Sequence, residues 1–556
     1  MKHNFAPPSD HAYNLLTSVS RGNRCPAPLA LLSTYAPARI AQTHRHLEMS
    51  QPNPPDTPRR RILLEMRPAL DGFAGIPQET RLLFRNLATS PLIEIAGLLQ
   101  TSLRFLSPGT LLPNDGKDDD THPISERFNQ YSRTIVSLDT KPNNKLLSEI
   151  ELYLKRRRVA YGLMLKTALL GGRNTIPLTH FDSRHFEEYV WQALFSKTLP
   201  AEDFSHVTLR PFRVCTVPWN IMQSAGLLSL KWRKRAVYPT IDTTGHDVFI
   251  AQTPYPGRVA PGTKLVVRYH DALPIFMPHA FANKSRHQAT HFRALADNVA
   301  QGAYFACVSE STRQDLLSVF PELETRSVTI PNMVSHHFFS EDSPTSHVES
   351  IVRTRRNTSI SDTPFQHPPG VTFRYLLMVS TLEPRKNHAL LISAFAALRA
   401  STDPELKLII VGSIGWDADS IIRDMQPWLE QDAIYPLERV PADELRVLYR
   451  HATATVCPSV AEGFDFSGVE AMRSGSVVAA SDIPVHREIY ADAAEYFDAH
   501  SAASLTDSLR RMLTSPEASA KRQHAIERGA AISEQYLPDN ILPQWEAFLS
   551  RVGPTA

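Results

Sequence analysis

The sequence predicts an α/β protein built from two doubly wound, Rossmann-like domains. Three observations support this fold class. A short apolar run at 61–66 is followed by a loop containing two glycines, a helical segment and a second apolar run at 92–99, which together make a βαβ unit. Short apolar strands and helical segments alternate again after residue 375. Between these regions, residues 341–370 are polar and rich in proline, as is typical of an interdomain linker.

The composition narrows the range of functions. The 556 residues include 59 Lys+Arg and 57 Asp+Glu, and this balance gives no reason to expect a nucleic-acid partner. The four cysteines lie far apart and form no CxxC pair, which excludes a disulfide scaffold and favours a reducing compartment. The sequence shows neither a signal-peptide pattern nor a run of about 20 apolar residues. We therefore expect a cytoplasmic protein, or one that is peripheral on the inner face of the cytoplasmic membrane.

Changes in composition set the expected domain boundaries. Residues 1–58 are rich in Pro, Ser, His and Asn and are expected to form a disordered extension. Residues 59–340 are assigned to the N-terminal domain, with an insertion around 105–260 whose second half shows no clear pattern. After the linker at 341–370, residues 371–556 are assigned to the C-terminal domain.

Short apolar runs and flanking turn residues mark the expected elements of the N-terminal domain. We expect strands at 61–66, 92–99, 264–269, 304–308 and 327–330. Helices are expected at 79–87, 149–170 and 287–301, and another after the N-cap residue Ser309. The polar residues 107–145 are expected to form a surface insertion.

The C-terminal domain alternates between the two element types. Its expected strands are 375–379, 406–411, 453–457, 477–480 and 495–497. Its expected helices are 387–399, 441–450, 468–474 and 502–514.

The first candidate for chemistry is the segment PSVAEGFDFSGVEAM, which begins at Pro458. Glu462 is expected in the loop at the carboxyl end of a strand, where ligands bind in open α/β sheets. Glu470 is expected in the first turn of the following helix, where a carboxylate can accept hydrogen bonds from a ribose diol. The helix N-terminus between them suits a phosphate. The alternative is that Glu470 only complements the helix dipole and Glu462 is a solvated loop residue.

The second candidate is Ser380-Thr-Leu-Glu-Pro-Arg385-Lys386, between a strand and a helix. Two adjacent cations there suit a diphosphate and would stabilise charge on a leaving phosphate. The alternative is a solvated turn. The occurrence of both motifs in one α/β domain favours the ligand site.

These segments resemble a known family of enzymes. STLEPRKNHALLISAF, LKLIIVGSIGW and PSVAEGFDFSGVEAMRSGSVVAASDIPVHREIYADAAEYFD are similar to the C-terminal domain of family-4 retaining glycosyltransferases, whose fold is GT-B, with two facing Rossmann-like domains around a central cleft. Glu462 and Glu470 match the Glu-x7-Glu motif of that family. RILLEMRPALDGFAGI and VVRYHDALPIFMP resemble its acceptor-side domain. The closest likeness is to bacterial transferases of surface polysaccharide synthesis, often of mannose or rhamnose.

The resemblance implies a role for each matching residue. Arg385 and Lys386 would hold the nucleotide diphosphate, and Glu470 the ribose hydroxyls. Glu462 would bind hydroxyls of the donor sugar, and His270 would face that sugar from the other domain. Backbone groups of the loop and the helix start would contact the sugar and phosphates, namely those of Gly463, Phe464, Asp465, Phe466, Ser467, Gly468 and Val469. Gly72 and Gly75 would let the first loop pass close to the sugar or phosphate.

The sequence departs from the family pattern at two places: the first concerns the charges that hold the phosphates, and the second, in the acidic loop, leaves the donor sugar open. Many members carry an arginine six residues before the lysine, where this chain has Ser380, so Arg385 would supply the missing charge. The loop reads Gly-Phe-Asp-Phe-Ser instead of the common Gly-Phe-Gly-Leu-Pro.

The resemblance implies a retaining hexosyltransferase that uses a GDP- or UDP-linked sugar and requires no metal or other cofactor. Its partners would be the nucleotide-sugar donor and a glycan or lipid-linked acceptor in polysaccharide or lipopolysaccharide synthesis, with mannose favoured as the sugar. The alternatives are a non-catalytic subunit that binds a sugar nucleotide or acts as a scaffold, and a sugar-nucleotide epimerase with the GT-B fold.

Three other patterns are weighed against ordinary explanations. The DxD at 118–120 lies in a polar segment, which favours a solvated loop over a metal site. His287 and His291 are four residues apart without a third ligand, which favours a surface helix. Basic residues at 155–158 and 231–235, with Lys166 and Arg173, flank apolar positions and suit an anionic membrane surface. The alternative for these basic residues is a solvated helix whose apolar face, formed by Leu163, Leu165 and Leu169, covers the core.

Overall fold

The structure is a computed structural model. It describes residues 59–552, apart from 71, 73–74, 111–122, 140–145, 171–174, 282, 362–364, 366–371 and 515–517. All of these residues belong to one compact unit of the chain, 57–556. The expected disordered extension at 1–58 and the DxD at 118–120 lie outside the described residues.

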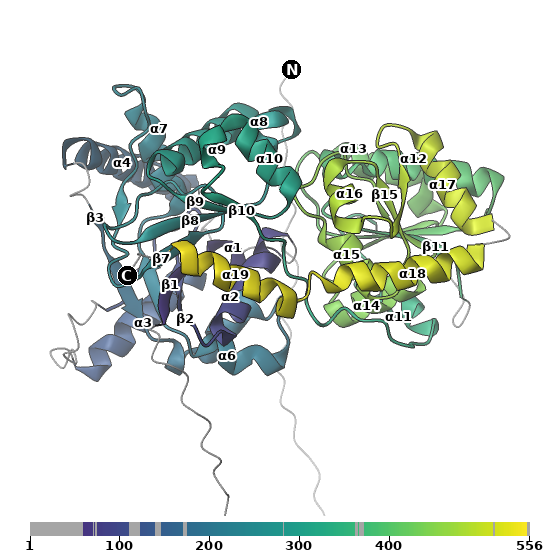
Figure 1. Ribbon diagram of the computed structural model, residues 1–556, viewed down its shortest axis with the longest axis horizontal. Coiled ribbons are helices and arrows are strands. Elements are labelled where there is room, and N and C mark those ends of the chain that lie inside the picture. The colour runs from purple at the N-terminus through teal and green to yellow at the C-terminus, as the bar shows by residue number, and fades with distance from the viewer. Residues whose placement is uncertain are drawn as a thin grey trace, which may run out of the picture. The chain divides into compact units, whose positions relative to one another are not determined.

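The N-terminal part of this unit is built on an eight-stranded sheet (Figure 1). The strands, in the order in which they pair across the sheet, are β10 (Ser327–Thr329), β9 (Tyr304–Cys307), β8 (Lys264–Tyr269), β7 (Val248–Ala251), β1 (Arg60–Glu65), β2 (Ile93–Leu99), β5 (Phe212–Cys215) and β4 (Leu178–Phe181). All pairs are parallel except β4 with β5. The strands predicted for this domain are confirmed. β4, β5 and β7, together with the small pair β3 (Thr175–Ile176) and β6 (Thr240–Ile241), come from the region whose pattern could not be interpreted.

Helices pack against this sheet. The longer ones are α2 (Ile76–Thr89), α3 (Ile124–Asp139), α4 (Leu146–Leu170), α7 (Trp219–Ser229), α9 (Lys284–Ala300) and α10 (Glu310–Val319). The shorter ones are α1 (Arg67–Leu70), α5 (Glu187–Val190), α6 (Phe204–Thr208) and α8 (Leu273–Phe276). Ser309 caps α10 as predicted, since its hydroxyl accepts a hydrogen bond from the amide of Thr312.

The polar segment expected to be a surface insertion differs from that expectation. Residues 124–139 form α3, and Tyr131 and Leu138 on this helix are buried in the main hydrophobic core. They are spaced seven residues apart, or two helical turns, so they share one apolar face. The polar residues between them concealed this pattern.

The C-terminal part is built on a six-stranded, fully parallel sheet. The strands, again in pairing order, are β13 (Ile434–Leu437), β12 (Lys407–Val411), β11 (Tyr375–Val379), β14 (Ala454–Cys457), β15 (Val478–Ser481) and β16 (Ala494–Phe497). Its helices are α12 (His388–Ser401), α13 (Asp419–Glu430), α14 (Ala442–His451), α15 (Phe466–Arg473), α16 (Pro484–Tyr490), α17 (Ala502–Thr514) and α18 (Ala518–Glu534). The predicted elements are confirmed, while β13, α13, α16 and α18 were not predicted.

The expected linker at 341–370 contains a helix, α11 (Ser346–Arg355). Val348, Ile351 and Val352 on this helix are buried in the core of the C-terminal part. Arg355 also forms a two-pronged ion pair with Glu444, with both contacts at 2.6 Å. Residues 346–355 therefore belong to the C-terminal fold and are not a linker.

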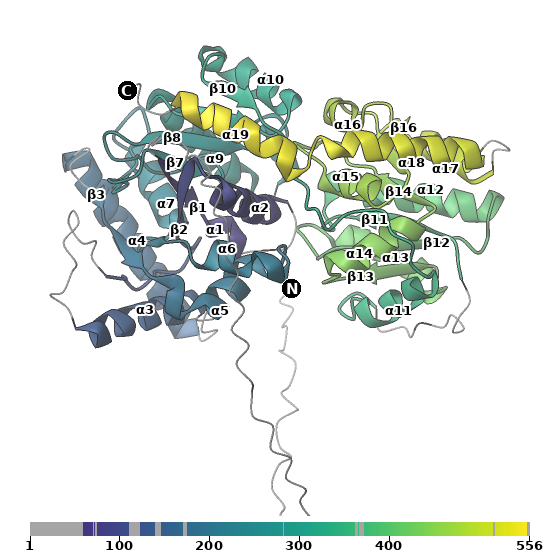
Figure 2. The same ribbon diagram turned by 60° about the horizontal axis from the view of Figure 1, so that its bottom comes forward.

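The last helix also departs from the expected boundary at 371–556. Helix α19 (Pro538–Val552) leaves the C-terminal sheet and packs on the N-terminal one, and Figure 2 shows it beside α2. Trp545 is fully buried there, and the side chain of Arg60 donates a hydrogen bond to the carbonyl of Ser550. The apolar face of α19 finds its partners in the first domain, so the two parts of the chain are joined twice.

Candidate active site

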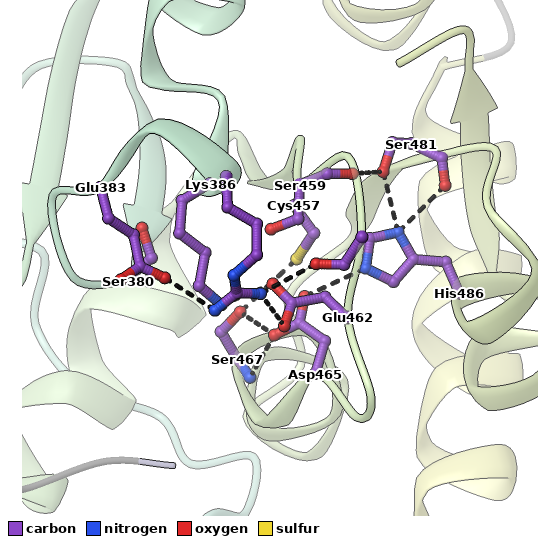
Figure 3. A network of polar contacts seen from close by, with 12 residues as sticks. Ser380, Glu383, Lys386, Cys457, Ser459, Glu462, Asp465, Ser467, Ser481 and His486 are labelled. Carbon is purple, nitrogen blue, oxygen red and sulfur yellow. Dashed lines mark hydrogen bonds and ion pairs between the residues drawn. The ribbon is translucent and has the colours of Figure 1, made fainter. Parts of the chain in front are cut away.

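The acidic and basic loops predicted from the sequence meet in the structure. Glu462 follows β14, while Arg385 and Lys386 form a short 3-10 turn after β11. Nζ of Lys386 lies 2.5 Å from Oε1 of Glu462 (Figure 3). Nη1 of Arg385 lies 2.7 Å from Oε2 of the same carboxylate. Since β11 and β14 are neighbouring parallel strands, both loops leave the same edge of the sheet.

Arg385 and Lys386 differ in how many of their donors the protein occupies. The guanidinium of Arg385 also donates to the carbonyl of Ala461 at 2.8 Å and to the carboxylate of Glu383 at 2.7 Å. Among the described residues, Glu462 is the hydrogen-bond partner of the Lys386 ammonium, which carries three N–H donors. Arg385 therefore orients Glu462, whereas Lys386 has donors left for a ligand.

The charges in this cluster reinforce one another. Burial alone would raise the pKa of Glu462, but the charges of Arg385 and Lys386 outweigh this effect and lower it. Burial opposes the charge of Arg385, yet Glu462 and Glu383 raise the pKa of its guanidinium above the usual value. Glu462 is thus held as a carboxylate at neutral pH, with its side chain only 5% exposed.

The side chain of Asp465 caps the N-terminus of α15, where the sequence predicted a site for a ligand phosphate. Its Oδ1 atom accepts hydrogen bonds from the amide of Ser467 at 3.0 Å and from the hydroxyl of Ser467 at 2.6 Å. Its Oδ2 atom lies 3.4 Å from Nε2 of His486, whose Nδ1 atom lies 3.0 Å from the hydroxyl of Ser481 (Figure 3). Burial would raise the pKa of Asp465, but His486 and Lys386 lower it well below its usual range. The side chain therefore acts as an ionised N-cap.

Glu470 lies one turn further into the helix than predicted. Because α15 begins at Phe466, Glu470 is in the second helical turn, not the first. Its Oε1 atom accepts a hydrogen bond from Nε2 of Gln78 at 2.7 Å, and its Oε2 atom accepts one from the hydroxyl of Tyr449 at 3.3 Å. Burial raises the pKa of Glu470 to about 7, against the effect of these two hydrogen bonds. The carboxyl group is thus poised to change its protonation near neutral pH.

The backbone of His270 lies against the acidic loop, while its expected place facing the donor sugar stays a prediction. A Cβ atom at Gly463 would lie only 1.7 Å from the carbonyl oxygen of His270, so the loop fits here only without a side chain. Nε2 of His270 is buried and has no hydrogen-bond partner among the described residues. Burial and the charge of Arg268 lower the pKa of His270 well below its usual value, so its imidazole is neutral. A bound ligand would give Nε2 the partner that it lacks.

The remaining predicted residues play supporting parts. Gly72 and Gly75 adopt positive φ angles of 60° and 72°, and Gly75 precedes α2, the helix that carries Gln78. Gly468 permits close packing, because a Cβ atom there would lie 2.2 Å from the hydroxyl of Tyr490. The side chains of three predicted ligand-binding residues are buried in the hydrophobic core, so only their backbones could contact a donor, and these are Phe464, Phe466 and Val469.

Sequence reasoning missed Gln78, Tyr449 and His486. Gln78 lies 392 residues from Glu470, and no local pattern reports a contact over that distance. Tyr449 lies on a predicted helix without any motif around it. The only available signal was His486 itself, a histidine two residues after the proline that begins α16.

The described residues contain no group of three or more His, Cys, Asp or Glu side chains placed to hold a metal. His291 is partly buried beside Tyr269, and burial lowers its pKa to about 3. His287 instead stacks on the ring of Phe281 with 4.7 Å between centroids. These two histidines therefore have other contacts, in keeping with the simpler explanation of their spacing.

Part of the chain is similar in sequence to known glycosyltransferases. Residues 359–531 match the family model for glycosyl transferases group 1. The chain is 31% identical over 170 residues to O-antigen chain mannosyltransferase B of Escherichia coli, which covers 31% of this chain and 44% of that protein. It is 31% identical over 155 residues to O-antigen chain mannosyltransferase RfbU of Salmonella typhimurium, and this match covers 28% of this chain and 42% of that protein. The chain thus spans less than half of the length of these relatives.

A solved structure extends the likeness to the whole fold. Sucrose-phosphate synthase from Thermosynechococcus elongatus is matched with a TM-score of 0.51 over 89% of this chain and 99% of that one, at 13% identity. The fold class is GT-B, as the sequence predicted. The predicted resemblance to mannosyltransferases of this fold is also confirmed.

Proposed function

We propose that this protein is a retaining glycosyltransferase, which moves a hexose from a nucleotide-diphosphate sugar to a glycan or lipid-linked acceptor. The observation that carries this proposal is the convergence of Lys386, Arg385 and Glu462, with Glu470 on the helix that follows. A cation with unused donors beside a fixed carboxylate suits a ligand that combines a diphosphate with sugar hydroxyls.

In this proposal, each side chain acts on a different part of the donor. Lys386 binds the diphosphate and stabilises the charge that develops as it leaves. Glu462, oriented by Arg385, accepts hydrogen bonds from hydroxyls of the sugar. Glu470 accepts hydrogen bonds from the ribose, in exchange for the bond from Gln78. Nε2 of His270 forms a hydrogen bond with the sugar from the opposite side.

The proposed reaction retains the configuration of the sugar. The bond between the anomeric carbon and the diphosphate breaks through an oxocarbenium-like state, and the acceptor hydroxyl attacks from the same face. The leaving phosphate takes the proton of that hydroxyl. We assign no carboxylate as a covalent nucleophile, because Glu462 is tied to two cations at 2.5 and 2.7 Å. The retaining glycosidases differ, since there a free carboxylate attacks the sugar.

Mannose is the first sugar to test, since the names of the two relatives above describe O-antigen chain mannosyltransferases. The donor base is proposed to be guanine or uracil. We propose no metal or other cofactor for the reaction, because the charge of the leaving diphosphate is met by Lys386. The proposed process is the synthesis of a polysaccharide or lipopolysaccharide.

The proposed place of the reaction is the cytoplasm, with the protein peripheral on the inner face of the cytoplasmic membrane. Among the described helices, none has the length and apolar content needed to cross a bilayer. Lipid-linked acceptors would be encountered at such a surface.

A donor screen separates the proposal from its two alternatives. The protein is incubated with GDP-mannose and with UDP-linked hexoses, with and without a glycan acceptor. A transferase releases the nucleoside diphosphate, and the release increases when an acceptor is present. A binding or scaffold subunit only gains thermal stability, whereas an epimerase converts one sugar nucleotide into another. Either of these results overturns the proposal.

A further inference from the structure

One surface of the N-terminal part combines exposed apolar side chains with cations. We call it the α4 surface and define it as the exposed residues of α4 together with residues 231–235. Its large apolar members are exposed by 49–75%, and they are Ile150, Tyr153, Leu154, Leu165, Leu169, Leu170 and Trp232. Its exposed cations are Lys155, Arg157, Arg158, Lys166, Lys231, Arg233, Lys234 and Arg235.

The exposed positions form a continuous stripe along the helix. Leu154, Arg158, Leu165 and Leu169 are separated by four, seven and four residues, so they share one face of α4. The opposite face is buried where Ala160, Met164 and Thr167 lie. The stripe therefore points away from the core.

Residues 231–235 are held beside this helix by direct contacts. Nη2 of Arg233 donates to the carbonyl of Ala168 at 2.9 Å. A hydrogen bond from Arg157 and the nearby charge of Lys231 lower the pKa of the Tyr161 hydroxyl, which places both cations at the same ring. Helix α4 also packs along α7, the helix that leads into residues 231–235 (Figure 1). The two basic segments thus form a single surface.

The simpler explanation from the sequence, in which the apolar face of α4 covers the core, holds for only one of its three residues. Leu163 packs against a buried cluster, but Leu165 is 50% and Leu169 is 75% exposed. Single exposed apolar residues are common on protein surfaces. Here they alternate with cations. The acidic residues of α4, Glu149 and Glu151, lie near its start, and none occurs in 152–170 or 204–241. This combination calls for a partner that is both apolar and anionic.

We propose that the α4 surface docks on an anionic lipid bilayer. The cations meet lipid headgroups, while Leu169 and Trp232 enter the boundary between headgroups and acyl chains, where indole rings are favoured. This inference deepens the proposed function, because it names the surface through which the enzyme reaches a lipid-linked acceptor. The partner is identified by charge complementarity, since a neutral apolar partner would leave the cations unpaired.

The test is co-sedimentation of the full chain with phosphatidylcholine vesicles, with and without about 30% phosphatidylglycerol. Binding is expected only with the anionic lipid, and it weakens as NaCl is raised from about 0.1 to about 0.5 M. The double reversal Lys155→Glu/Arg158→Glu is expected to lower the partition coefficient at least about tenfold. Its matched control, Arg423→Glu/Lys521→Glu, changes the same charge on two exposed residues of the C-terminal part and should bind as the wild type does.

A second pair of variants tests the apolar contribution without changing charge. Leu169→Ser/Trp232→Ser should reduce the binding that remains at high salt, whereas Leu92→Ser/Leu209→Ser, also exposed by about half, should not. The proposal is overturned if the wild type ignores anionic vesicles, or if both patch variants bind like their controls. A patch-dependent dimer without vesicle binding overturns it as well. Release of nucleoside diphosphate with a soluble acceptor should persist in all four variants, which separates failure of docking from failure of the proposed reaction.

Discussion

Gln78 donates a hydrogen bond from Nε2 to Oε1 of Glu470 over 2.7 Å and joins residues 392 positions apart. Gln78 lies in the first turn of α2 on the N-terminal sheet, and Glu470 lies on α15 of the C-terminal sheet. The carboxyl group proposed to hold the ribose is therefore already bound by the other part of the chain. A nucleotide that takes this carboxylate must replace the bond from Gln78, which couples donor binding to the contact between the two parts.

The raised pKa of Glu470 predicts a pH-dependent stability. The pKa is about 7 in the folded protein against a reference of 4.5, so the folded state holds this proton where the unfolded state has lost it. The contribution of Glu470 to the free energy of unfolding should fall as pH rises from about 4.5 to about 7, by about 3 kcal/mol at most. Glu470→Gln removes the titration and keeps the shape. Urea unfolding of both proteins across this range checks the prediction, and parallel stability curves would refute it.

Lys386 is predicted to act on the leaving group. Lys386→Ala should lower kcat by about 100- to 1000-fold, because a preorganised charge beside the leaving phosphate is lost. The fold should persist, since Arg385 still pairs with Glu462 at 2.7 Å. Steady-state rates and thermal unfolding of the purified variant measure the two effects, with Lys264→Ala as the control at an exposed lysine. Wild-type turnover in Lys386→Ala would remove the assigned role.

Asp465 is predicted to stabilise α15 as its N-cap. Asp465→Ala should lower the free energy of unfolding by about 1–2 kcal/mol, because the amide of Ser467 loses its acceptor. Asp465→Asn should cost less, because asparagine is also a good N-cap. Denaturant unfolding of both variants tests this order. Equal losses in the two variants would mean that the contact with His486, and not the cap, dominates.

Gly463 is predicted to be required for the contact between the acidic loop and His270. A Cβ atom at this position would lie 1.7 Å from a backbone carbonyl, which cannot swing away as a flexible side chain could. Gly463→Ala should therefore displace the loop and lower kcat/KM at least about tenfold. Gly162→Ala is the matched control, because nothing lies within 4 Å of its Cβ position. Measuring kcat/KM for both variants tests this prediction. A Gly463→Ala enzyme with the kcat/KM of the wild type would show that the contact is dispensable.

Local pattern was sufficient to predict five strands of each sheet and the two charged loops. Apolar runs such as 375–379 are bounded by polar turns, and the strand directions of a parallel sheet then bring Glu462 and Lys386 to one edge. Strand β13 was not predicted because Pro436 interrupts its apolar run. A proline within a strand is tolerated here because β13 lies at the edge of the sheet.

The relationships that escaped prediction depend on contacts between distant parts of the chain. The apolar face of α19 could be recognised as a helix face, but its place on the first sheet depends on surfaces hundreds of residues away. The same limit applies to the bond between Gln78 and Glu470. Buried charges add to the difficulty: Arg268 interrupts an apolar strand, and only the structure supplies its partner Glu79 at 2.9 Å.

The central claim is that the Lys386–Glu462 cluster transfers a hexose from a nucleotide-diphosphate sugar. The most direct measurement follows the wild type and Lys386→Ala by NMR, with GDP-mannose, UDP-linked hexoses and a glycan acceptor. The account predicts an acceptor-dependent nucleoside diphosphate and a product that keeps the anomeric configuration of the donor, both nearly lost in the variant. A product of inverted configuration, or equal turnover by the two proteins, would contradict it.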